Sequence, residues 1–236
     1  MNRTDGRDME REGARVSGIY AKYARSRSRR RKWSADNPGN IAIRDELFDE
    51  LRAAAPEAVH GQGRVLDVGC GRGYWLGRML ADGVAASRLH GIDVMSERLE
   101  AARLPPEVEL RQADARRLPY PDQHFHLVLM FTVLSSLASR EDARRALTEA
   151  RRVTAGGGAI LIYEPRIPQP LNRATLWIRR RDVGEVLGPD VETRTLTALP
   201  PLARRLGRSA TRIYPRLSSC PALRTHHLMV HERLPS

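Results

Sequence analysis

Nine residues between positions 65 and 73 constrain the fold of this 236-residue chain more than any other segment. They read Val-Leu-Asp-Val-Gly-Cys-Gly-Arg-Gly: a short apolar run with one carboxylate, Asp67, and then glycines at alternate positions, Gly69, Gly71 and Gly73. Glycine has no Cβ, so the chain can turn sharply from strand to helix and a ligand can approach the backbone closely. We therefore expect a strand, a ligand-binding turn and a helix that begins at Tyr74.

A dinucleotide-binding turn is the nearest alternative for this segment. Its fingerprint, G-x-G-x-x-G, counted from Gly69, requires glycine at position 74, where Tyr74 stands. A carboxylate such as Asp67 would also repel a pyrophosphate. The pattern Asp-x-Gly-x-Gly-x-Gly instead resembles the first motif of the class I S-adenosylmethionine (SAM)-dependent methyltransferases. SAM brings an ammonium and a sulfonium and no phosphate, so an acidic loop suits it.

Acidic residues also end the next two predicted strands. Asp93 closes the apolar stretch Leu89–Val94, about 20 residues past the glycines, where open α/β sheets place a ribose-binding carboxylate. Asp114 lies at the end of Val108–Ala115. The family resemblance implies that Asp93 binds the two ribose hydroxyls and that Asp114, with the backbone amide of Ala115, binds the adenine edge. It also implies that Phe131 lies at the cofactor-facing end of the fourth strand.

Strands and helices alternate along the chain. Further strands are expected at Leu127–Phe131, Ala159–Tyr163, Val191–Leu196 and Leu223–Glu232, and helices at Ile41–Ala54, Tyr74–Ala81, Ser96–Arg103, Glu141–Thr154, Leu171–Arg181 and Pro201–Leu206. Such alternation predicts an α/β protein with a mostly parallel sheet covered on both faces. With the resemblance, the expected fold is a seven-stranded Rossmann-like sheet whose last strand is antiparallel.

The domain organisation expected from these patterns is simple. Residues 1–14 are polar and lack periodicity, which predicts a disordered tail, and residues 15–236 form a single domain. Within it, residues 15–55 are expected to form an N-terminal helical lid, 60–165 the SAM-binding core, and 166–236 the acceptor side with the last two strands. In related methyltransferases tyrosines of an N-terminal helix cover the cofactor, which makes Tyr20 and Tyr23 candidates here.

A general base is required if the methyl acceptor is a hydroxyl. The beginning of an antiparallel last strand returns to the ligand-binding edge, which makes His226 a candidate, and Glu164 leaves the fifth strand at the same edge. His226 and His227 are adjacent in a strand, so only one of them can face the site. His124 and His126 precede the fourth strand and belong at the opposite edge.

Charge leaves a second function class open. The chain carries a net charge of +12, and 38 of its 40 basic residues are arginine, a bias that points to nucleotide composition rather than to selection for a polyanion. The cluster Arg25–Lys32 could still neutralise phosphates. We expect methyl transfer from SAM to an oxygen or nitrogen of a small molecule, such as a secondary metabolite or sugar. An RNA methyltransferase and a SAM-binding protein without transferase activity remain the alternatives.

The composition indicates in which compartment the protein is expected. Its two cysteines, Cys70 and Cys220, form no metal-ligand pattern and no disulfide framework, so no metal is expected. No apolar run approaches the ~18 residues that a membrane span needs, and no secretory signal is visible at the N-terminus. The sequence therefore predicts a cytoplasmic enzyme.

Overall fold

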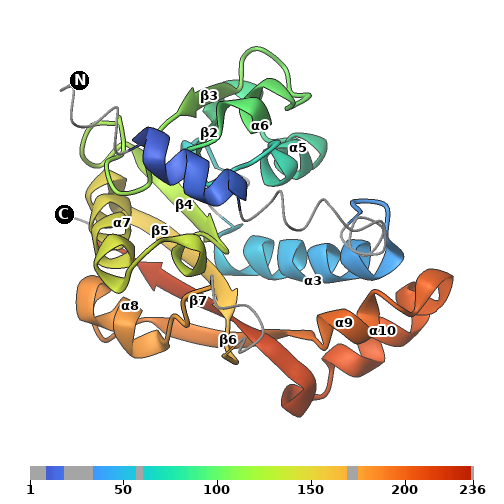
Figure 1. Ribbon diagram of the computed structural model, residues 1–236. Coiled ribbons are helices and arrows are strands. Elements are labelled where there is room, and N and C mark those ends of the chain that lie inside the picture. Colours follow the sequence, from blue (N-terminus) through green and yellow to red (C-terminus); the bar gives the residue numbers. More distant parts are fainter. Residues whose placement is uncertain (1–8, 19–33, 57–60, 169–174, 235–236) are drawn as a thin grey trace.

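A seven-stranded sheet forms the centre of the protein, in the order β3-β2-β1-β4-β5-β7-β6 (Figure 1). The computed structural model describes residues 9–18, 34–56, 61–168 and 175–234. The strands are β1 (Val65–Val68), β2 (Leu89–Asp93), β3 (Glu109–Gln112), β4 (Phe125–Phe131), β5 (Thr154–Pro165), β6 (Glu192–Ala198) and β7 (Arg224–Glu232). The pairs from β3 through β5 are parallel, whereas β7 runs antiparallel to β5 and β6. The predicted sheet, with its antiparallel last strand, is confirmed.

Helices cover both faces of this sheet. They are α3 (Pro38–Ala54), α5 (Tyr74–Ala81), α6 (Ser96–Glu100), α7 (Arg140–Val153), α8 (Arg180–Leu187), α9 (Pro200–Ala203) and α10 (Ala210–Ser218), with short 3-10 turns η1 (Ala86–Arg88), η2 (Leu134–Ser136), η3 (Gly207–Ser209) and η4 (Pro221–Leu223). Leu51 of α3 and Leu76 of α5 are buried in one core cluster. Ala146 of α7 and Val183 of α8 are buried in another, on the opposite face. No helix in the described part of the chain is both long enough and apolar enough to cross a membrane.

The C-terminal helices differ from the prediction. Residues 175–179 are not helical, and α8 begins only at Arg180, so the helix expected at Leu171–Arg181 is misplaced; residues 169–174 lie outside the described residues. The side chain of Asp182 accepts from the backbone amide of Arg179 at 2.9 Å and starts α8 at this point. Helix α10 was not predicted, because Pro215 inside it removes a backbone donor and argues against a helix.

The N-terminus also differs from the expected tail. Residues 9–18 form a helix, so residues 9–14 are ordered, while residues 1–8 lie outside the described residues. Glu12 is only 7% exposed, and Arg15 pairs with it and donates to the carbonyl of Ser136. These contacts with distant parts of the chain hold a segment whose own sequence shows no helical periodicity.

Candidate functional site

The glycine turn between β1 and α5 has the backbone conformation that requires glycine. Gly69, Gly71 and Gly73 have φ angles of +71°, +58° and +75°, values that side chains with a Cβ rarely adopt. A Cβ at Gly69 would lie 2.8 Å from Cγ2 of Val133, and one at Gly73 would lie 2.4 Å from Cδ1 of Leu104. The turn therefore folds only with small residues, and it opens at the carboxyl edge of the sheet, where open α/β sheets bind ligands.

Asp93, at the end of β2, ties this turn to the neighbouring strand. Its Oδ2 accepts a hydrogen bond from the Gly71 amide and its Oδ1 accepts one from the Met95 amide, both at 2.9 Å. The guanidinium of Arg98 lies 3.8 Å from Oδ2. The side chain that is expected to bind ribose is thus 4% exposed and held in one orientation.

Substitution of Asp93 by alanine is expected to weaken SAM binding by about 1–3 kcal/mol, or about 5- to 150-fold, because two ribose hydroxyls lose a charged acceptor. Calorimetric titration of the folded variant with SAM measures the loss. Asp93→Asn, which keeps one acceptor oxygen, should lose less. Wild-type affinity in the alanine variant would mean that ribose binds elsewhere.

Asp67 contributes a buried carboxyl group with unused hydrogen-bonding capacity. It is 1% exposed, and its Oδ2 has no hydrogen-bond partner among the described residues. Burial, with a smaller contribution from the charge of Asp93, raises the pKa of the Asp67 carboxyl to about 8. A buried carboxylate without a counter-charge is costly. The site therefore fits a cationic ligand, as the ammonium and sulfonium of SAM would provide, and is unsuited to a phosphate.

The raised pKa predicts pH-dependent binding. Below pH 8 the ligand-free Asp67 holds a proton, which a cationic ligand would displace, so SAM affinity should fall by up to about tenfold per pH unit from pH 8 to pH 6. Asp67→Asn should flatten this dependence. In the ligand-free protein the folded state keeps the proton of Asp67 up to about pH 8, whereas the unfolded chain releases it near the ordinary pKa of 3.8. The Asp67 carboxyl therefore lowers the free energy of unfolding as the pH rises from about 4 to about 8.

Two measurements test this prediction. Titration calorimetry at pH 6, 7 and 8 gives the affinities, and buffers of different ionisation enthalpy reveal the released proton. Thermal melts of the ligand-free proteins should show Asp67→Asn more stable than wild type at pH 8, with a smaller gain at pH 5. Equal slopes of affinity against pH in both proteins would show that no cation binds beside Asp67.

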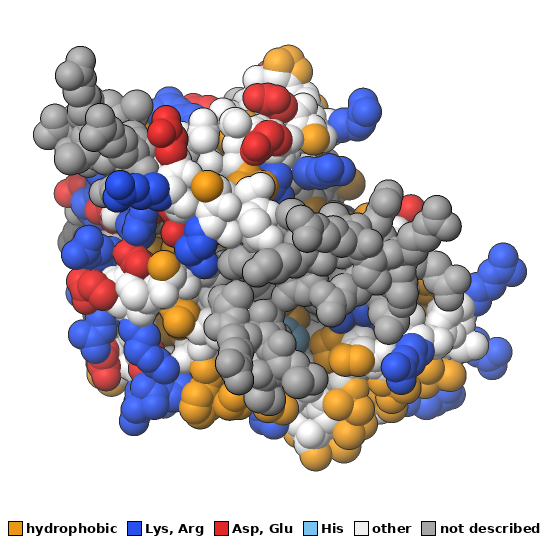
Figure 2. Space-filling model, in the orientation of Figure 1, with side chains coloured by type: hydrophobic (Ala, Val, Ile, Leu, Met, Phe, Trp, Pro, Cys, Tyr) orange, Lys and Arg blue, Asp and Glu red, His pale blue; other side chains and the backbone are white. Residues whose placement is uncertain are grey.

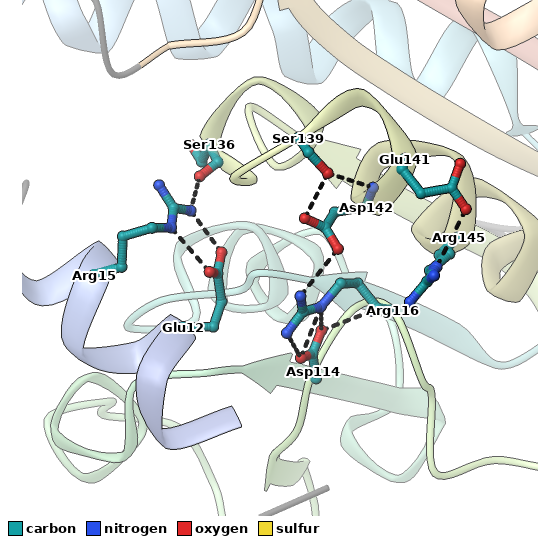
Figure 3. Close-up of polar contacts among 9 residues, drawn as sticks. All are labelled: Glu12, Arg15, Asp114, Arg116, Ser136, Ser139, Glu141, Asp142 and Arg145. Atoms are coloured by element: carbon teal, nitrogen blue, oxygen red, sulfur yellow. Dashed lines mark hydrogen bonds and ion pairs between the residues drawn. The ribbon is translucent and has the colours of Figure 1, made fainter. Parts of the chain in front are cut away.

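Asp114, the expected adenine ligand, lies in an ion-pair network (Figure 3). Arg116 donates to its two carboxylate oxygens through Nε and Nη2, at 2.6–3.0 Å. The Nη1 of Arg116 also donates to Asp142 of α7 at 3.0 Å, and Asp142 is bound by Ser139, the N-cap of that helix. The loop with Asp114 and Ala115 is thereby fixed to the helix that follows β4.

The helix over residues 9–18 connects the two sides of this region (Figure 3). Arg15 donates to the Ser136 carbonyl after β4, and a Cβ at Gly13 would lie 3.3 Å from the carbonyl of Val94 after β2. The N-terminal segment thus contacts loops on both sides of β1 at the carboxyl edge. Tyr20 and Tyr23, predicted to cover the cofactor, lie outside the described residues.

A row of rings extends from β4 to β7 on the α3 face of the sheet. The centroids of Phe131 and Tyr163 are 6.0 Å apart, and the rings of Tyr163 and His226 stack at 4.8 Å with an interplanar angle of 8°. Asp67 points to this face as well, since Val65, two residues before it, packs in the same cluster as Phe131 and Tyr163. Of the two adjacent histidines, His226 therefore shares the face of Asp67.

Glu164 has different surroundings from His226. It is fully buried, pairs in register with His227, and accepts a hydrogen bond from the Ser135 amide at 3.2 Å. Burial raises the pKa of Glu164 to about 7, although hydrogen bonds from Ser135 and from the backbone of Leu134 and Val133 oppose that shift. Its carboxyl group holds the η2 loop after β4.

The neighbours of His226 determine which ring nitrogen carries its proton. The hydroxyl of Thr225 donates its one hydrogen to the carbonyl of Thr197 at 2.9 Å, so it can only accept from Nδ1 of His226, also at 2.9 Å. The neutral ring then carries its proton on Nδ1 and a lone pair on Nε2. Burial, with the charges of Arg204 and His227, lowers the pKa of His226 to about 4. His226 is therefore neutral at physiological pH, and the lowered pKa makes it a weak base.

The structure brings some of the predicted residues together. Hydrogen bonds join the glycine turn to Asp93, and the backbone of Ala113 joins β3 to the carbonyl of Asp93. Sequence reasoning missed Arg98, Arg116 and Thr225. Arg98 and Arg116 each follow a strand-ending acid within five residues, which is a signal that could have indicated them; Thr225 follows only from the pairing of β6 with β7.

Comparison with known proteins agrees with this geometry. Residues 65–158 match the family model described as a methyltransferase domain. The chain is 38% identical over 118 residues to a phosphatidylethanolamine N-methyltransferase of Cereibacter sphaeroides, covering 47% of this chain and 54% of the relative. It is 30% identical over 146 residues to a 27-O-demethylrifamycin SV methyltransferase of Amycolatopsis mediterranei, covering 59% of this chain and 52% of the relative. The matched part thus spans about half the length of these relatives.

The fold itself recurs in solved structures. A SAM-dependent methyltransferase from Archaeoglobus fulgidus superimposes with a TM-score of 0.57 at 15% identity, covering 80% of this chain and 94% of that chain. At this identity the likeness concerns the arrangement of helices and strands alone.

Proposed function

Because the chain belongs to the class I SAM-dependent methyltransferases, whose cofactor is SAM, we propose that it transfers a methyl group from SAM to an oxygen or nitrogen of a small-molecule acceptor in the cytoplasm. The relatives support a small-molecule acceptor, since their names specify phosphatidylethanolamine, demethylmenaquinone and a demethylrifamycin. The free cysteines, Cys70 and Cys220, are consistent with a reducing compartment.

The observation that carries this proposal is the Oδ2 of Asp67 beside the glycine turn, which has no hydrogen-bond partner in the part of the chain that the structure describes. Asp67 would lie near the positive charges of the cofactor, and Gly69, Gly71 and Gly73 would let the backbone approach it. When bound, SAM supplies a methyl group activated by its sulfonium. The adenosine part would be held at the ends of the strands. Asp93 would bind the ribose hydroxyls, Asp114 and the Ala115 amide would bind the adenine edge, and Phe131 would lie beside the cofactor.

The residues of this chain would mainly align the acceptor and exclude water. His226 is the better of the two candidate bases, because its Nε2 bears a lone pair and its ring lies on the face of Asp67. Glu164, fully buried against the η2 loop, fits less well as a base. We assign it the positioning of the loop that follows β4.

A single-turnover assay with SAM radiolabelled on the methyl group tests the proposal. Small-molecule extracts and bulk RNA are offered as acceptors in separate reactions, and binding of SAM is measured independently by calorimetry. Label appearing in a small molecule is the expected result. Label in RNA instead would favour the RNA-modifying alternative, and SAM binding without transfer to either acceptor pool would favour the non-enzymatic one.

A further inference from the structure

A long segment of this chain has no acidic residue. Between Glu192 and Glu232, residues 193–231 contain seven arginines, three histidines and no aspartate or glutamate. The segment includes α9, η3, α10 and η4, which form one corner of the molecule (Figure 1). We call the exposed side of residues 200–218 the α9–α10 surface.

The exposed arginines of the α9–α10 surface differ in their pairing from most of those on helix α7. Arg205, Arg208, Arg212 and Arg216 are exposed, and none of them makes an ion pair with any residue that the structure describes. Helix α7 is also rich in arginine, but three of its four exposed arginines have acidic partners. The fourth, Arg151, donates to the carbonyl of Val186 and makes no ion pair with a described residue. The α7 pairs are Arg140 with Asp182, Arg144 with Glu185, and Arg145 with Glu141. Among the described residues, four exposed arginines therefore lack an ion pair at the α9–α10 surface, against one on α7.

Apolar side chains are exposed among these charges. Leu202 of α9 is 39% exposed and Ile213 of α10 is 38% exposed. Figure 2 shows hydrophobic and basic side chains gathered at the corner where Figure 1 places α9 and α10. Exposed apolar side chains among arginines are typical of a surface that lies in the headgroup region of a membrane.

The α9–α10 surface is held firmly on the rest of the domain. The backbone carbonyl of Arg204 accepts a hydrogen bond from the side chain of Asn37 at 3.2 Å. The Nε of Arg204 donates to the side chain of Asn40 of α3 at 2.7 Å. On α10, the hydroxyl of Tyr214 donates to Glu46 of α3 at 2.6 Å. Because these contacts lie on the inner side, the outer side is presented in a fixed geometry.

We propose that the α9–α10 surface docks onto an anionic lipid surface. Its arginines would bind acidic headgroups, and Leu202 and Ile213 would enter the boundary between headgroups and acyl chains. A single-stranded nucleic acid would instead favour exposed aromatic rings for base stacking. The aromatic residue within 200–218, Tyr214, is buried and 2% exposed, so it is not available for stacking. The basic segment Arg25–Lys32 lies outside the described residues and forms no part of the proposed surface.

Vesicle co-sedimentation of the full chain tests this docking. Vesicles of phosphatidylcholine alone are compared with mixed vesicles of phosphatidylcholine and phosphatidylglycerol. We expect the wild type to prefer the mixed vesicles and to lose affinity with added salt. Each arginine near an anionic surface is worth about fivefold in affinity, so the quadruple variant R205Q/R208Q/R212Q/R216Q should bind about 600-fold more weakly if the four effects add. The variant L202S/I213S should bind several-fold more weakly.

The matched control is R144Q/R145Q on α7, which removes exposed but paired arginines and should bind within about twofold of wild type. The segment Arg25–Lys32 is present in every variant, so it cannot explain a difference between them. If the quadruple variant does not fold, the single variants R208Q and R212Q should each lose about fivefold in affinity for the mixed vesicles.

Two outcomes would overturn the proposal. One is a wild type that does not distinguish the two kinds of vesicle. The other is a wild type that binds single-stranded RNA through the four arginines, with L202S/I213S unchanged on vesicles, since this would assign the surface to a nucleic acid.

Discussion

Gly71→Val is expected to abolish detectable SAM binding and methyl transfer while leaving most of the sheet folded. Gly71 has a φ of +58°, which a β-branched residue adopts only with strain. Its amide donates to Asp93, and a Cβ at this position would lie 3.2 Å from Nη2 of Arg98. The valine would therefore disturb the turn, its hydrogen bond to the expected ribose ligand, and the space through which the cofactor approaches the backbone.

A second glycine separates the loss of the site from general backbone strain. Gly83 has a φ of +93° and no atom within 4 Å of its would-be Cβ, and it follows α5 away from the glycine turn. Gly83→Val should thus lower the melting temperature and keep SAM binding. Thermal shift of both variants and the wild type with SAM, S-adenosylhomocysteine and NAD gives the comparison. Stabilisation of the wild type by NAD alone would contradict the SAM site, because Asp67 would then face a pyrophosphate.

The central sheet could be predicted from sequence because its strands are buried runs that end in recognisable residues. Helix α5 begins and ends where its pattern indicated, at Tyr74 and Ala81. The segment after β5 could not be predicted in the same way. There the start of α8 depends on a capping interaction of Arg179, and α10 contains a proline that local rules exclude from a helix.

The candidate site likewise contains residues that local sequence could predict and residues that it could not. The glycines and strand-ending acids are local signals, so the turn and Asp93 were predicted and lie within hydrogen-bonding distance of each other. The distinction between His226 and Glu164 needed the register of β7, which shows that they belong to opposite faces. Strand direction alone had placed both at the same edge.

The arginine bias of the composition also requires the structure for its interpretation. A uniform compositional cause would leave arginines alike everywhere. Most of those on α7 instead have acidic partners, whereas Arg205, Arg208, Arg212 and Arg216 of the α9–α10 surface make no ion pair with any described residue. Net charge alone could not show this difference, because it depends on which acids lie nearby in space.

His226→Gln is expected to lower kcat about 10²-fold for a hydroxyl acceptor, the lower end of the usual contribution of a general base, because a pKa of about 4 makes this histidine a weak base; SAM affinity should change little. Glutamine retains polarity but cannot take up the proton. Because the pKa of His226 is lowered to about 4, the wild-type histidine is neutral throughout the range from pH 6 to pH 8. The rate of the wild type should therefore show no titration of this group in that range. Single-turnover rates with the acceptor found by the labelling assay, measured across this range, provide the check.

Three further variants distinguish a base from a packing residue. His227→Gln, on the opposite face, should retain activity within about twofold. Thr225→Val removes the hydroxyl that accepts from Nδ1, so the ring can also take the tautomer with its proton on Nε2, and kcat should fall about tenfold. Thr225→Ser restores that hydroxyl and should restore the rate, which a purely steric role of Thr225 would not explain. If His226→Gln and His227→Gln proved equally active, the stacked ring of His226 would serve packing alone, and the acceptor would have to lose its proton without help from this residue.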